Sequence, residues 1–99
     1  MPEPRTSKPE YAPFLLASLR ELGEAPREAV LRRTRELMDA ILHPADCVPL
    51  HGGRTPRWVN QADHMLDGLM EEGYVEEKGP ILRLTGKGLA YFGGRGESL

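Results

Sequence analysis

Three residues with the chemistry of zinc ligands recur at intervals of four in the middle of the sequence. His43, Cys47 and His51 supply two imidazoles and a thiol, and Asp46 stands among them. Zinc prefers imidazole and thiolate ligands. Two prolines would break any helix that placed the three on one face, and the chain has no second cysteine. We therefore expect a buried Cys47 with two loop histidines, and neither a metal site nor another cofactor.

Nucleophilic catalysis has no clear basis in this sequence. No serine, cysteine or histidine stands beside an obvious general base, and no phosphate-binding loop occurs. The lone cysteine excludes an intramolecular disulfide. We expect a protein that is not an enzyme.

A polar face is predicted on a helix that spans about 56–72. Positions 57, 61, 64 and 68 share one side of such a helix, with position 60 at its edge. Arginine matches the edge of guanine, and asparagine or glutamine matches that of adenine. Asp63 and Asp67 lie on a neighbouring stripe and would repel phosphates, so an ordinary solvated face is the alternative.

Further candidate contacts flank this helix. The Thr55-Pro56 end would offer backbone N–H groups to a phosphate, and the basic residues of the following hairpin could reach the DNA backbone. The predicted nucleic-acid contacts are Arg54, Thr55, Arg57, Asn60, Gln61, His64, Lys78, Arg83 and Lys87. For the basic cluster Arg32, Arg33 and Arg35 we expect salt bridges with Glu28, Glu36 and Asp39 instead.

The elements that must position these residues follow from apolar spacing and caps. We expect helices over 11–22, from Pro26 to shortly before Pro44, over about 56–72 with Thr55 as N-cap, and over 86–91, with a hairpin at 74–84. Residues 1–10 and 93–99 are predicted to be flexible tails around one domain, 11–92. The fold class is mainly α with a small β-hairpin, a winged helix-turn-helix.

From Tyr11 to Phe92 the chain resembles the Mrr-type N-terminal winged-helix domain that precedes restriction-endonuclease catalytic domains. The resemblance is carried by Gly52-Gly53-Arg54, by Arg57-Trp58-Val59-Asn60, by Glu72-Gly73-Tyr74, and by the run from Leu82 to Gly88. It implies a DNA-binding role that recruits or orients a partner activity. The nuclease domain of those proteins is not part of this sequence.

Two functions remain open at this point. The first is binding of double-stranded DNA, with the third helix in the major groove and the hairpin as the wing. The alternative is protein–protein interaction or homodimerisation, for which Tyr11 and Phe14 on the first helix would form the surface. The net charge of −2, from 13 basic and 15 acidic residues, gives no strong electrostatic preference for DNA.

The expected location is the cytoplasm, without a membrane partner. The N-terminus lacks the apolar stretch of a signal peptide, and no apolar run approaches the about 20 residues that span a bilayer.

Overall fold

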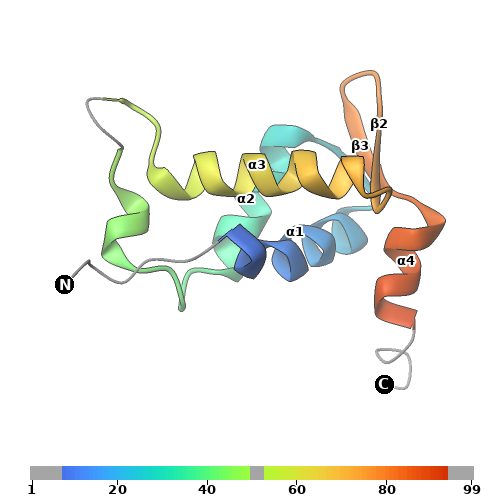
Figure 1. The fold of residues 1–99 in the computed structure, drawn as a ribbon, viewed down its shortest axis with the longest axis horizontal. Helices are drawn as coiled ribbons and strands as arrows, with labels where there is room; N and C mark the ends of the chain where they lie inside the picture. The colour runs from blue at the N-terminus through green and yellow to red at the C-terminus, as the bar shows by residue number, and fades with distance from the viewer. Residues whose placement is uncertain (1–7, 50–52, 94–99) are drawn as a thin grey trace.

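The computed structural model describes residues 8–49 and 53–93 (Figure 1). Its helices and strands follow in the order helix, strand, helix, short 3-10 helix, helix, hairpin, helix. Their bounds are α1 Lys8–Leu22, β1 Glu24–Pro26, α2 Arg27–Leu37, η1 Pro44–Cys47, α3 Arg57–Glu71, β2 Val75–Lys78, β3 Ile81–Leu84 and α4 Gly86–Gly93. The predicted class, mainly helical with a small antiparallel sheet, is confirmed, and the order is compatible with a winged helix.

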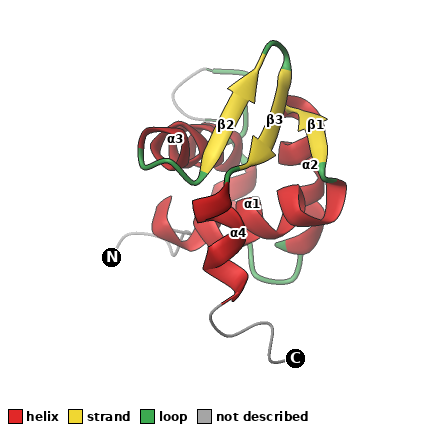
Figure 2. Ribbon diagram, turned by 90° about the vertical axis from the view of Figure 1, so that its right-hand side faces the viewer, coloured by secondary structure: helices red, strands yellow, loops and turns green. Residues whose placement is uncertain are grey.

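Helix α1 lies at the centre of the core, between α2, α3 and the sheet (Figures 1 and 2). Each of the three long helices buries one face at helical spacing. On α3 the buried side chains are Ala62, Leu66 and Leu69. The other buried apolar side chains are Tyr11, Leu15, Leu16, Leu19, Ala25, Val30, Met38, Val75 and Leu82.

The sheet contains one strand more than the predicted hairpin. Strand β1 pairs antiparallel with β3, so the strand order is β1-β3-β2. Gly23, with a φ of +80°, ends α1 and lets the chain turn directly into β1. Pro26 ends this edge strand and is the N-cap of α2, because its fixed φ suits both positions.

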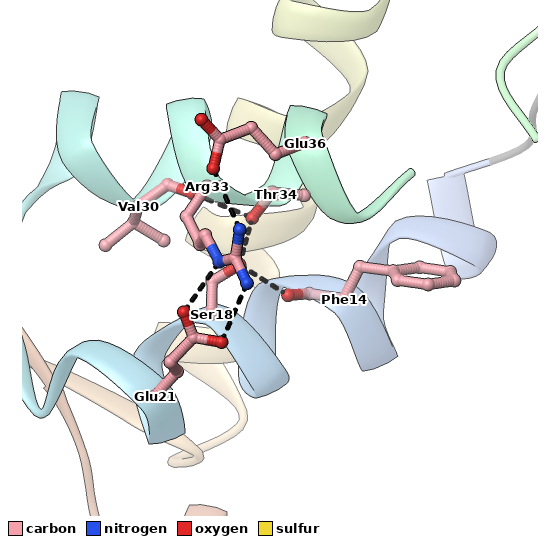
Figure 3. Close-up of polar contacts among 7 residues, drawn as sticks. All are labelled: Phe14, Ser18, Glu21, Val30, Arg33, Thr34 and Glu36. Atoms are coloured by element: carbon pink, nitrogen blue, oxygen red, sulfur yellow. Dashed lines mark hydrogen bonds and ion pairs between the residues drawn. The ribbon is translucent and has the colours of Figure 1, made fainter. Parts of the chain in front are cut away.

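A buried pair of hydroxyls joins α1 to α2 (Figure 3). Ser18 Oγ and Thr34 Oγ1 lie 2.9 Å apart, and each hydroxyl also lies 2.8 Å from the carbonyl oxygen four residues earlier, that of Phe14 or Val30. Two hydroxyl protons can form only two of these three hydrogen bonds at once. Both hydroxyl oxygens still have a partner, so the polar pair is compatible with the surrounding core.

The basic cluster of α2 forms salt bridges, as expected for two of its three members. Arg33 lies between Glu21 and Glu36 at 2.7 and 2.9 Å (Figure 3). Arg35 pairs with Asp39 at 2.6 Å. Among the described residues, Arg32 and Glu28 form no ion pair, and Arg32 is exposed.

Two expectations about α1 are wrong. The helix begins at Lys8, three residues before its predicted start at Tyr11, and Tyr11 is fully buried. Phe14 is half-buried and packs against the core. Neighbouring elements cover most of α1, so Tyr11 and Phe14 do not form an exposed dimer surface.

The segment after α2 also differs from the prediction. The helix, expected to run until shortly before Pro44, ends at Leu37, and Ile41 in the following turn is 45% exposed. Cys47, expected to be buried, is exposed, whereas Asp46 is fully buried. The 3-10 turn points Asp46 inward because its carboxylate there accepts hydrogen bonds from a backbone N–H and an arginine.

Helix α4 starts as predicted, with Thr85 as its cap: the backbone N–H of Gly88 donates to Thr85 Oγ1 at 3.1 Å.

None of the helices within the described ranges is long and apolar enough to cross a membrane.

Candidate nucleic-acid interface

The N-terminus of α3 is held by the preceding loop. The backbone N–H of Arg57 donates to the carbonyl oxygen of Val48 at 2.9 Å, and Pro49 and Pro56 form a β-bridge. The helix therefore begins at Arg57 with Pro56 as N-cap, and no side chain caps it. The prediction of Thr55 as N-cap is wrong, because these loop contacts fix the chain one residue later.

Arg57 is part of the fold and does not belong to the exposed face. Its side chain is 13% exposed, and its guanidinium lies 2.9 Å from the fully buried carboxylate of Asp46. The other carboxylate oxygen of Asp46 accepts the backbone N–H of His43 at 2.9 Å. This correction has a simple cause: a buried carboxylate needs a positive partner, and Arg57 is positioned to provide it.

Three of the predicted contact residues remain together on one side of α3. Asn60 and Gln61 are half-buried, and His64 is exposed. In the part of the chain that the structure describes, none of their side chains forms a hydrogen bond or ion pair. Their amide and imidazole groups are therefore available to a ligand.

The acidic stripe of α3 is paired to α2. Arg27 lies 2.6 Å from Asp63 and 3.0 Å from Asp67. Burial acts to lower the pKa of Arg27, but the two carboxylates outweigh it and raise the pKa above its ordinary value. The arginine offsets the negative charges that would repel phosphates. The sequence gives no local sign of this contact, since 36 and 40 residues separate the partners.

The two cationic residues predicted as contacts on the hairpin differ in their surroundings. Lys78 is exposed at the end of β2, beside Gly79, whose φ of +62° suits a two-residue hairpin loop. Arg83 instead pairs with Glu76 on β2 and with Glu24 on β1. Those two carboxylates raise the pKa of Arg83. Arg83 therefore joins the three strands.

Lys87 is likewise held within the molecule. Its ammonium donates to the backbone carbonyl of Glu72 at 2.7 Å and lies 4.5 Å from the centre of the Tyr74 ring. A cation in this position stabilises the junction between α3, the hairpin and α4. Of the predicted residues outside α3, Arg54, Thr55 and Lys78 are exposed, as is Lys87 despite its contacts with Glu72 and Tyr74.

The possible zinc ligands fall partly outside the described residues, because His51 lies in the segment 50–52. Within the described ranges, no three His, Cys, Asp or Glu side chains are grouped to hold a metal ion.

Comparison of the chain with protein-family models, curated proteins and solved structures finds no match.

Proposed function

We propose that this chain is a winged-helix module that binds double-stranded DNA, with α3 as the recognition helix and the β2–β3 hairpin as the wing. The observation that carries the proposal is the group formed by Asn60, Gln61 and His64. These polar side chains lie on one helix and have no bonding role in the described part of the fold. Asn60 also belongs to the motif that resembles Mrr-type N-terminal domains.

The exposed cations flank this group. Arg54 precedes the N-terminal end of α3, and Lys78 lies on the hairpin that follows its C-terminal end (Figure 1). A helix in the major groove has a phosphate backbone on either side. Arg54 and Lys78 would contact these backbones, while Asn60 and Gln61 would each pair with the N6 and N7 positions of an adenine.

Arg57 has an indirect role in this proposal. With Asp46, it holds the loop that carries Arg54 against the start of α3. It is a positioning residue and does not read bases.

The double variant Asn60→Ala and Gln61→Ala tests the recognition face. We expect its affinity for a duplex selected from a random library to fall, by about 5-fold to 150-fold for each lost bidentate contact. The melting temperature should remain unchanged, because neither amide bonds to the rest of the described chain. Fluorescence anisotropy would measure the affinity.

Arg32→Ala is the control, since Arg32 is exposed on α2 and forms no ion pair with any residue that the structure describes. It should bind the selected duplex like the wild type. Wild-type affinity in the double variant would contradict the assignment of α3 as the recognition helix.

A further inference from the structure

The side chain of α3 that is typical of guanine recognition is engaged inside the protein. Arg57 is the single basic residue in the sequence of this helix. A guanidinium recognises guanine by donating hydrogen bonds to its O6 and N7 atoms. The Arg57 guanidinium instead lies 2.9 Å from the fully buried Asp46 carboxylate, and its side chain is only 13% exposed. It is therefore not available to a guanine.

The carboxylates beside the polar face of α3 are engaged as well. A carboxylate recognises cytosine by accepting a hydrogen bond from the N4 amino group. Asp63 and Asp67 instead accept hydrogen bonds from Arg27 of α2, at 2.6 and 3.0 Å. Glu71 is exposed, but it is the last residue of α3, and a recognition helix presents its N-terminal residues to the bases. Neither base of a G·C pair thus has its characteristic partner available at the reading end of the described helix.

The side chains that remain on this face match adenine. Asn60 and Gln61 lie near the N-terminal end of α3, and no residue within the described ranges occupies their amides. An amide accepts from N6 and donates to N7 of adenine at the same time. His64 is exposed beside them, and its imidazole can donate to N7, which both purines present. This histidine therefore adds affinity without discriminating between adenine and guanine.

We infer that the DNA this module prefers is rich in A·T pairs and that α3 reads adenine in the major groove. The inference rests on the proposed DNA binding and adds the class of sequence that is bound. Its cause is tertiary, because ion pairs with Asp46 and Arg27 occupy the charged groups of α3 that would favour G·C pairs. Arg54, which precedes the helix, remains a phosphate contact and carries no preference for a base.

Four duplexes of equal length and with the same order of purines and pyrimidines test the inference. They contain only A·T, only G·C, only inosine·cytosine or only diaminopurine·thymine pairs. Inosine lacks the amino group that guanine places in the minor groove, so inosine·cytosine combines the major groove of G·C with the minor groove of A·T. Diaminopurine·thymine has the opposite combination. Fluorescence anisotropy of each labelled duplex with the full chain at about 50 mM salt measures the four affinities.

We expect the A·T and diaminopurine·thymine duplexes to bind at least about 5-fold more tightly than the other two. Equal affinity for A·T and G·C would overturn the inference. So would an inosine·cytosine duplex that binds like A·T, because recognition would then lie in the minor groove. In both cases the proposed DNA binding would stand. Absence of binding to all four duplexes would contradict the proposed function, and the inference with it.

The double variant Asn60→Ala and Gln61→Ala assigns the preference to α3. It should bind the A·T and G·C duplexes with equal affinity, because contacts to the phosphates carry no sequence information. Arg32→Ala, on the exposed side of α2, is the control and should keep the full preference for A·T. Unfolding curves should show that both variants are folded. A preference for A·T that persists in the double variant would show that other residues read the bases, and would overturn the inference.

Discussion

Asp46 and Arg57 form the most deeply buried ion pair among the described residues. The carboxylate has no solvent exposure, and each of its oxygens accepts a hydrogen bond, one from Arg57 and one from the backbone of His43. Such a pair is not necessarily more stabilising than apolar residues of the same shape. Loss of Arg57, however, would leave the charge of the Asp46 carboxylate buried without its positive partner.

Arg57→Ala is therefore expected to destabilise the fold. It should lower the free energy of unfolding by about 3 kcal/mol, because Asp46 would keep its charge without its partner. Denaturant unfolding monitored by circular dichroism would measure the loss. Arg32→Ala, at an exposed position without an ion pair in the described part of the chain, should change the stability by less than about 0.5 kcal/mol. Equal effects of the two substitutions would show that the Asp46 pair has no structural role.

At the level of elements, α4 depends on one close approach. A Cβ atom at Gly88 would lie 2.2 Å from the backbone oxygen of Tyr74. A contact that short cannot exist, so a larger residue would displace α4 from the end of the sheet. Thr85 strengthens the same junction, since its hydroxyl donates to the carbonyl of Gly73 at 2.5 Å and accepts the N–H of Gly88.

Gly88→Ala should lower the free energy of unfolding by about 1–3 kcal/mol, the usual cost of overpacking. Gly86→Ala provides the comparison on the same helix, because nothing lies within 4 Å of a Cβ added there. It should be neutral or stabilising by up to about 1 kcal/mol. Thermal unfolding of the two variants would measure the difference. A Gly88→Ala protein as stable as Gly86→Ala would contradict the tight packing of α4 on Tyr74.

The elements that the sequence predicts are those with local signals. Helix α3 and the hairpin follow from apolar period and turn residues, and Thr85 is recognisable as a cap. Strand β1 has three residues, one of them proline, and its partner Arg83 is 59 positions away from Glu24. A strand this short has no periodic pattern, so only the folded chain reveals it.

The candidate site also has a part that local spacing predicts and a part that depends on tertiary packing. Helical spacing correctly groups Asn60, Gln61 and His64, since it depends only on neighbours along the chain. The ion pairs of Arg57 and Arg83 depend on carboxylates that tertiary packing brings close. Residue types alone therefore overestimate how many cations are available to DNA.

For the whole molecule, the internal ion pairs determine how the proposed affinity for DNA should change with salt concentration. Arg27, Arg57 and Arg83 all pair with carboxylates near α3 or the sheet. Within the described ranges, the cationic groups of Arg54 and Lys78 are exposed and form no contact, whereas that of Lys87, although exposed, donates to the carbonyl of Glu72. Two phosphate contacts imply that the logarithm of the affinity falls with the logarithm of the salt concentration with a slope of about −2.

Fluorescence anisotropy of a labelled mixed-sequence duplex, titrated with the protein at about 50 mM and about 200 mM salt, tests the central claim most directly. We predict binding at the lower salt concentration and an affinity about tenfold weaker at the higher one, as two phosphate contacts require. The variant Arg54→Ala should reduce the slope by about one, whereas Arg83→Ala should leave it unchanged. Absence of any anisotropy change at about 50 mM salt would contradict the proposal that α3 and the hairpin bind DNA.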